Sequence, residues 1–458
     1  MDSFWARLGI DRAVFFTLLT RGWSIGAGLL TIVLVTRFLS PNLQGYYYTF
    51  NSLIALQIFV ELGLTVVIVQ FASHEMAHLA WTAEGTVSGN PQSKRRLQSL
   101  MHFALTWFGV AALLLVAVLL PVGWYFFGNA PPKGAPVPGV GWAWALLVIP
   151  TAVNLVVSAA VSVLEGCGKV EQIAVLRLWQ SVFAVTASWL VLSFGGSLYA
   201  LAANSLMTAL LAAIWLYVKY RRFLRDILAK TTGLPGLDWR HELWPFQWRI
   251  ALSWMSGYLI FHLFNPLLFA SHGPVVAGQM GMSLTIISAM NGAAMAWIST
   301  KTPMYGQLVA TRQVKALDTL FFRGFIQSFS FLLIGVCSVL LLFRYLSLAQ
   351  SPYATRVLPL PLFSLLGLVC LANHIVYSEG AYLRAHKQEP FMALSIISGV
   401  ATSILALLLV PPFGAAGAVY SYATSAMVIC LCGGTFVFFR KRREWAGNRS
   451  ELAETVLP

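Results

Sequence analysis

Residues 93–127 read SKRRLQSLMHFALTWFGVAALLLVAVLLPVGWYFF. Three consecutive cations, Lys94, Arg95 and Arg96, are followed by a segment, 101–127, that contains no Asp, Glu, Lys or Arg. About 20 apolar residues in a helix, at 1.5 Å per residue, cross a hydrocarbon core of roughly 30 Å. The segment therefore predicts a membrane-spanning helix, and the cations before it predict that this helix begins on the cytoplasmic side.

Similar apolar segments recur along the whole chain. The predicted spans are residues 13–38, 45–69, 101–127, 142–164, 172–194, 198–218, 248–270, 276–298, 325–343, 358–377, 391–410 and 414–439. The composition agrees, since 58% of the residues are hydrophobic and only 10% are charged, unlike the balance in soluble domains. We therefore expect an all-α polytopic membrane protein with about 12 transmembrane helices.

The connections between these spans are alternately basic and nearly free of cations. About 23 of the 30 Lys and Arg residues lie in the terminal segments or after even-numbered spans, which the positive-inside rule assigns to the cytoplasm. Both termini are therefore predicted to be cytoplasmic. The net charge of +14 follows from this bias, so it requires no nucleic-acid partner.

The chain also resembles a duplication of six spans. GKVEQIAVLRLWQ (168–180) and FGGSLYALAANS (194–205) correspond to HKQEPFMALSIIS (386–398) and FGAAGAVYSYATS (413–425). Because six is even, two such halves would be parallel repeats, with a central cavity between them. The predicted parts are an N-terminal lobe (1–222), a cytoplasmic connector (223–247), a C-terminal lobe (248–443) and a cytoplasmic tail (444–458).

Charged residues inside the first two spans are candidate functional residues. A charge in the membrane costs at least about 2.5 kcal/mol, so it requires a partner or a function. Arg21 and Glu61 are expected at similar depths on adjacent antiparallel helices, and Gln57 lies one turn before Glu61. They either form an ion pair that locks a hairpin or line a hydrated substrate cavity, where Glu61 is the candidate for the coupling ion.

Further candidates lie in both halves. Arg177 either faces the cavity or extends to the membrane interface. Tyr258, His262 and Asn265 share one face of span 248–270 at i, i+4 and i+7, and Asn291 lies in the next span. Such a histidine is either an interhelical hydrogen-bonding group or a proton carrier. His374 and Glu379 are polar residues late in span 358–377 and just after it.

Two cations flank spans of the second half. Arg249 lies at the cytoplasmic end of span 248–270, and Lys301 follows span 276–298. They could form a basic entrance for a phosphate group. Alternatively, they only satisfy the positive-inside rule.

One motif introduces an enzymatic alternative. His74, Glu75 and His78 form H-E-x-x-H, which on a helix places two imidazoles and a general base beside a zinc ion. A catalytic zinc requires a third ligand, and no recognisable third-ligand motif follows. We therefore expect no metal and no cofactor, and interpret this segment as an interfacial helix with Leu79 and Trp81 in the headgroups.

Three segments carry a family resemblance. TRFLSPNLQGYYYTFNSLIALQIFVELGL (36–64), LEGCGKVEQ (164–172) and LLLVPPFGAAGAVYSYATS (407–425) resemble polysaccharide flippases of the multidrug, oligosaccharidyl-lipid and polysaccharide exporter superfamily. The resemblance implies a two-lobed bundle that moves a lipid-linked oligosaccharide across a bacterial inner membrane by alternating access. It also implies that cations such as Arg21 and Arg177 meet the diphosphate and sugars.

Several alternatives remain at this level. The same fold could serve a cation-coupled multidrug exporter, and the zinc motif could serve a membrane protease. A scaffold for a polysaccharide synthase complex is a further alternative. The expected partners are membrane lipids, the lipid-linked glycan and a polysaccharide polymerase or other biosynthetic proteins.

Overall fold

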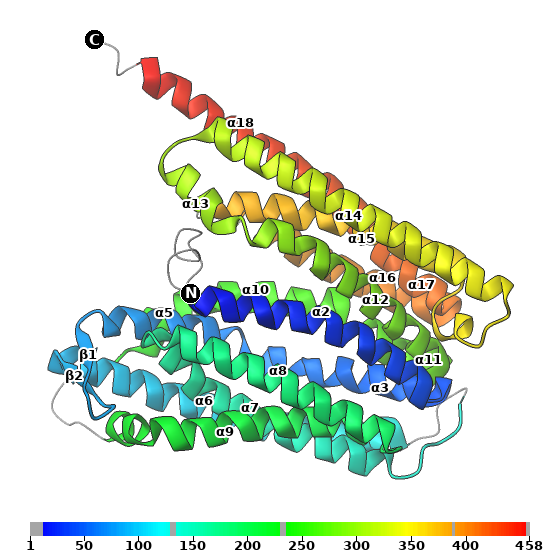
Figure 1. Ribbon diagram of the computed structural model, residues 1–458, viewed down its shortest axis with the longest axis horizontal. Helices are drawn as coiled ribbons and strands as arrows, with labels where there is room; N and C mark the ends of the chain where they lie inside the picture. The colour runs from blue at the N-terminus through cyan, green and yellow to red at the C-terminus, as the bar shows by residue number, and fades with distance from the viewer. Residues whose placement is uncertain (1–11, 129–133, 230–234, 387–389, 455–458) are drawn as a thin grey trace. The chain divides into compact units, whose positions relative to one another are not determined.

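The computed structural model describes residues 12–128, 134–229, 235–386 and 390–454, most of which are helical (Figure 1). The chain divides into two compact units, Met1–Met255 and Ser256–Pro458. The first unit contains α2 (Arg12–Phe38), α3 (Pro41–Ile54), η1 (Ala55–Gln57), α4 (Ile58–Glu61), α5 (Leu64–Met76), β1 (Leu79–Trp81), β2 (Val87–Gly89), α6 (Pro91–Gly128), α7 (Val140–Gly166), α8 (Val170–Ser193), α9 (Tyr199–Leu228), η2 (Trp239–Leu243) and most of α10 (Trp244–Phe261).

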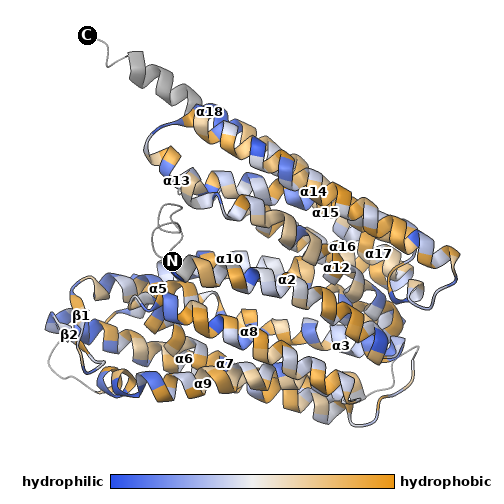
Figure 2. Cartoon of the chain, viewed as in Figure 1, coloured by the Kyte–Doolittle hydropathy of each residue, from blue (hydrophilic) through white to orange (hydrophobic). Residues whose placement is uncertain are grey.

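The second unit begins within α10. It continues with α11 (Phe264–His272), α12 (Pro274–Ser299), α13 (Thr302–Ala310), α14 (Val314–Leu348), η3 (Ala354–Arg356), α15 (Leu360–Ala385), α16 (Met392–Phe413), α17 (Ala415–Thr424), η4 (Ser425–Gly433) and α18 (Gly434–Glu454). Figure 2 shows hydrophobic residues along most of these helices and a hydrophilic group around the β1–β2 hairpin.

Among the described residues, ten helices are long and apolar enough to cross a membrane. An eleventh span results if Pro41–Glu61 and Leu64–Met76, which meet at a bend of 42°, are counted as one. The predicted span 248–270 differs, because the structure breaks it into α10 and α11 after Phe261. The all-α polytopic membrane fold is confirmed, whereas two parallel lobes around a central cavity remain a prediction.

The bend in the second span has a local cause. Leu62 and Gly63 both adopt left-handed backbone conformations, with φ of 51° and 65°. This region costs an ordinary L-residue about 1–2 kcal/mol and costs glycine little. A Cβ atom on Gly63 would lie 2.5 Å from Cγ2 of Ile250 on α10. Glycine therefore permits both the bend and the close approach of α10.

The helices of the first unit pack in a different order from the one expected. α2 lies along α8, where the Trp189 indole donates to the Thr31 hydroxyl at 2.9 Å. α5 packs instead on α6 and α7, and Gly166 permits this contact because a Cβ there would lie 2.5 Å from the Val69 carbonyl oxygen. The expectation that the first two spans pack side by side as a hairpin is therefore not met.

The segment after α5 also corrects an expectation. Residues 79–81 and 87–89 form an antiparallel hairpin in which Leu79 faces Gly89 and Trp81 faces Val87. The Trp81 indole donates to the Cys167 carbonyl at 2.9 Å. Leu79 is buried. The prediction of a helix at Leu79 and Trp81 is wrong, because these residues form a strand in which Leu79 is buried and Trp81 is half-buried.

The second unit has an aromatic core where α14, α15 and α18 meet. Phe321, Tyr382 and Phe438 are buried there. The Tyr382 hydroxyl donates to Asp318 at 2.9 Å, and Arg442 forms an ion pair with the same carboxylate at 2.7 Å. These contacts fix α18 to the helices before it.

The two units share one feature that the aligned segments suggested. α8 is followed by Phe194 and Gly195, and α16 ends at Phe413 before Gly414. Both glycines have positive φ, 80° and 58° respectively. The corresponding sequences therefore both place a glycine with positive φ directly after a phenylalanine at the end of a helix.

Candidate functional site

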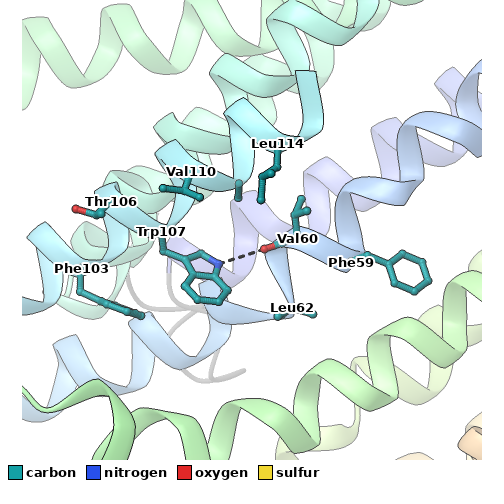
Figure 3. Close-up of a pocket in the computed structure, with 9 residues that line it drawn as sticks. Phe59, Val60, Leu62, Phe103, Thr106, Trp107, Val110 and Leu114 are labelled. Carbon is teal, nitrogen blue, oxygen red and sulfur yellow. Dashed lines mark hydrogen bonds between the residues drawn. The ribbon is translucent and has the colours of Figure 1, made fainter. Parts of the chain in front are cut away.

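The bend in the second span places a carboxylate beside an apolar pocket. Glu61 is the last residue of α4 and accepts a hydrogen bond from the Thr65 hydroxyl at 2.9 Å. Its neighbour Val60 lines a pocket of about 410 Å³ together with residues of α6 (Figure 3). The Trp107 indole crosses this pocket and donates to the Val60 carbonyl at 3.1 Å. The side chain of Trp107 therefore satisfies a backbone carbonyl at the bend.

Arg21 lies on an exposed part of α2, as does Ser24. Because α2 and the second span pack against different helices, the direct ion pair between Arg21 and Glu61 stays a prediction. Gln57 ends the short η1 turn and is half-buried. The structure thus interrupts the regular helix on which Gln57 and Glu61 were expected to lie one turn apart.

Arg177 has a partner that the sequence reasoning missed. Its Nη2 atom lies 2.5 Å from Oε2 of Glu165, which belongs to α7. The Arg177 side chain is 57% exposed and that of Glu165 is 19% exposed. The two residues are 12 positions apart across the turn between α7 and α8. Because this connection is short, the sequence could have indicated that the two side chains come close together. Arg177 is held near the end of its helix as half of an ion pair.

The three polar residues predicted to share a face of span 248–270 lie on both sides of a helix break. The rings of Tyr258 and His262 stack with centroids 5.6 Å apart, so these two share a face as expected. Asn265 is buried but belongs to α11. The predicted continuous i, i+4, i+7 stripe is therefore wrong at its third position, because the helix breaks after Phe261.

A buried histidine joins three helices of the second unit. His374 on α15 is fully buried. Its Nδ1 lies 3.1 Å from the Asn291 amide oxygen on α12, and its Nε2 lies 2.9 Å from the Ser328 hydroxyl on α14. The Ser328 hydroxyl also donates to the Phe325 carbonyl at 3.1 Å, so His374 links α12, α14 and α15 through one polar network. The structure thus brings Asn291 and His374 together, and adds Ser328.

The two predicted entrance cations belong to different units. The Arg249 guanidinium lies 5.6 Å from the Trp248 ring centroid. The Lys301 ammonium contacts α14, where a Cβ on Gly324 would lie 3.1 Å from it. A joint entrance formed by Arg249 and Lys301 stays a prediction.

The H-E-x-x-H segment has a structural role that its sequence did not suggest. Oε1 of Glu75 accepts from Nε of Arg96 at 2.6 Å. Nη2 of Arg96 also binds Glu242 in η2 at 2.5 Å. The hydrogen bond from Arg96 lowers the pKa of Glu242. Within the described ranges, no three His, Cys, Asp or Glu side chains are grouped as metal ligands. Glu75 is therefore one of two carboxylates through which Arg96 joins α6 to α5 and to the connector.

Aromatic rings reinforce the same junction. The Trp239 ring lies 5.8 Å from that of Phe103 and 5.9 Å from that of Trp107. The Leu237 amide donates to the Ser99 hydroxyl at 3.1 Å. The described part of the connector after residue 234 is thus docked on α6, near the pocket that Trp107 lines.

Several solved transporter structures have a fold similar to that of this chain. An inward-facing structure of a multidrug resistance MATE family transporter of the MOP superfamily aligns with a TM-score of 0.63 at 16% identity, over 91% of this chain and 93% of that one. A structure of the MATE multidrug transporter DinF-BH gives 0.61 at 12% identity, over 94% and 95%. The lipid II flippase MurJ, in an inward closed conformation, gives 0.60 at 12% identity, over 93% and 87%.

At these identities the likeness is one of fold. No curated protein matches the sequence. The family model described as "Polysaccharide biosynthesis protein" matches residues 11–278, which is more than half of the chain. With its apolar helices, the chain is a multi-pass membrane protein with a transporter fold, and it belongs to the polysaccharide biosynthesis protein family.

Proposed function

We propose that this protein moves a lipid-linked oligosaccharide, a polysaccharide precursor, across the bacterial inner membrane by alternating access. The observation that carries the proposal is the family match over residues 11–278. The fold shared with the lipid II flippase MurJ supports it. In this proposal both termini are cytoplasmic, and the protein has neither a catalytic reaction nor a cofactor.

The proposed substrate-binding residues are polar and occur in each of the two units. They are Arg21, Gln57, Glu61, Arg177, Tyr258, His262, Asn265 and Asn291, with Arg249 and Lys301 at the cytoplasmic entrance. Glu61 is the proposed site for a coupling ion, because its carboxylate adjoins a bend where backbone groups are already displaced from regular helix geometry. The proposed biosynthetic partner is a polysaccharide polymerase.

Transport is tested with purified protein in liposomes. The substrate is a fluorescent polyprenyl-diphosphate oligosaccharide, and a membrane-impermeant quencher reports how much of it changes leaflet. We expect transport by the wild type and a loss of at least tenfold in rate for Glu61→Ala. The control is Glu84→Ala, which removes an exposed carboxylate from the hairpin loop. Equal rates in liposomes with and without protein would refute the proposal.

A second candidate function follows from the MATE-like fold. A cation-coupled multidrug exporter would lower the accumulation of fluorescent cationic dyes in cells that overexpress the protein. A flippase would instead restore surface polysaccharide to a strain that lacks the gene. Dye efflux without restored polysaccharide would select the exporter.

A further inference from the structure

A second apolar groove lies on the first unit, between α8 and α9. Its volume is about 680 Å³, and its lining is almost entirely apolar. Trp179 and Phe183 stack along the α8 side with centroids 5.4 Å apart, while Ile214 and Val218 form part of the α9 side. All four side chains are exposed. A groove of this kind on a membrane helix pair offers a surface to a hydrocarbon chain.

The length of this groove along α9 is similar to the thickness of the hydrocarbon layer of one leaflet. Along α9 its lining extends from Leu211 to Lys219, which corresponds to about 12 Å at 1.5 Å per residue. Half of a hydrocarbon core is roughly 15 Å thick. The groove thus extends from the predicted cytoplasmic end of span 198–218 to nearly the middle of the membrane.

One lysine lies at the shallow end of the groove, and a second lies just before α8. Lys219 lines the groove itself, and Lys169 precedes α8 with its ammonium 4.1 Å from the Trp81 ring centroid. Burial, and then the positive charge of Lys219, lowers the pKa of Lys169. The positive charge of Lys219 therefore acts on Lys169, and a bound anion would offset this effect.

The neighbouring carboxylates are committed to other cations. Glu165 pairs with Arg177, and Glu171 lies 3.7 Å from Arg12. In the part of the chain that the structure describes, no ion pair involves either Lys169 or Lys219. An apolar groove that ends in two lysines without a carboxylate has the chemistry of a lipid tail joined to an anionic headgroup.

We propose that the α8–α9 groove binds an anionic glycerophospholipid, with an acyl chain against Trp179 and Phe183 and the phosphate between Lys169 and Lys219. Anionic lipids are concentrated in the cytoplasmic leaflet, where the positive-inside rule puts these lysines. The site is distinct from the apolar pocket at the bend of the second span. It does not depend on the proposed transport function.

The headgroup contribution is tested with the purified full chain in phosphatidylcholine nanodiscs. Phosphatidylglycerol of the same acyl composition is titrated in, and the lipid that remains bound is counted by native mass spectrometry. A lysine near an anionic surface contributes about fivefold in affinity. We therefore expect Lys169→Ala and Lys219→Ala each to lower phosphatidylglycerol retention by about that factor.

The matched control removes two exposed cations from the second unit, Lys315 and Arg323. The variant Lys315→Ala, Arg323→Ala should retain phosphatidylglycerol as the wild type does. The comparison is with the double variant Lys169→Ala, Lys219→Ala. If both double variants lose phosphatidylglycerol retention equally, net charge alone attracts the lipid. That result would overturn the proposal.

The acyl chain is tested separately by filling the groove. Val175→Trp, on the α8 wall, should lower retention of phosphatidylglycerol although both lysines remain. Leu211→Trp on α9 provides a second variant if the first does not fold. Displacement of the lipid by inorganic diphosphate, with no effect from either tryptophan, would identify a free-anion site and refute the lipid proposal.

Discussion

The Nε atom of Arg96 on α6 donates to Oε1 of Glu75 on α5 across 2.6 Å, although a β-hairpin separates the two helices in the chain. The other end of the same guanidinium binds Glu242 at 2.5 Å. One side chain thus connects two membrane helices to the segment that leads into α10. This junction is the part of the first unit in which a single substitution has the clearest expected effect.

Arg96→Ala should destabilise the protein by about 1–3 kcal/mol, because it leaves two partly buried carboxylates without their partner. The side chains of Arg96 and Glu75 are 25% and 11% exposed, so solvent compensates for part of the loss. Thermal unfolding in detergent, followed by tryptophan fluorescence, measures the effect. Arg221→Ala, at an exposed cation of α9, should leave the melting temperature unchanged. Similar losses in both variants would contradict a specific role for Arg96.

The same junction should be sensitive to acid. Arg96 lowers the folded-state pKa of Glu242 below an unfolded value of about 4.3. The stabilisation is therefore complete above that pH and disappears as the pH falls through the folded-state pKa. We expect the melting temperature of Glu242→Gln to lie below that of the wild type at neutral pH and to approach it below about pH 4. A melting temperature of Glu242→Gln that equals that of the wild type at neutral pH would exclude this carboxylate as the source, and Glu84→Gln is the control.

Gly63→Ala should be among the more damaging conservative changes in the first unit. It places a side chain at φ of 65° and a Cβ 2.5 Å from Cγ2 of Ile250, at a cost of about 2–4 kcal/mol for backbone and overlap together. Adding Ile250→Ala should restore only the stability that is lost through overlap with the Ile250 side chain, and not the part lost through the backbone conformation. Gly109→Ala is the control, since a Cβ there has nothing within 4 Å. Equal melting temperatures for Gly63→Ala and Gly109→Ala would show that the bend relaxes without cost.

The buried histidine can be tested with a double-mutant cycle. His374→Phe removes the hydrogen-bonding partner of Asn291, which should cost about 1–3 kcal/mol because a half-buried amide then lacks that partner. In the variant His374→Phe, Asn291→Leu both partners are apolar, so the combined loss should be smaller than the sum of the single losses by about 1 kcal/mol. Unfolding in a denaturing detergent provides the free energies. Strict additivity would mean that the two side chains are not coupled.

The membrane fold could be predicted from the sequence because its main signals are long and repeated. Segment 101–127 contains no Asp, Glu, Lys or Arg, and Lys94 to Arg96 mark one end of it. The breaks in the helices could not be predicted with the same ease. Leu62 adopts a left-handed conformation that nothing in its side chain requires. By contrast, the end of α10 at Phe261 has a signal in the sequence, because Pro266 has no N–H to donate to the carbonyl of His262, four residues earlier.

The candidate site was less predictable because its contacts depend on which helices are neighbours. Periodicity places Tyr258 and His262 on one face, and their rings do stack. It could not indicate that Glu75 faces Arg96, because this pairing requires the hairpin that returns the chain from α5 to α6. Similarly, the partners of His374 come from two other helices. Side chains on one helix are related by sequence spacing, whereas side chains on different helices are related only by the fold.

The hydrogen bond from Trp107 to the Val60 carbonyl has a consequence for how this protein can diverge. An indole donor at position 107 and a glycine at position 63 serve the same bend from different helices. Losing either one removes part of the reason for retaining the other. In relatives of this chain, these two positions should therefore change together, and chains with a straight second span should lack both the tryptophan on α6 and the glycine at the bend.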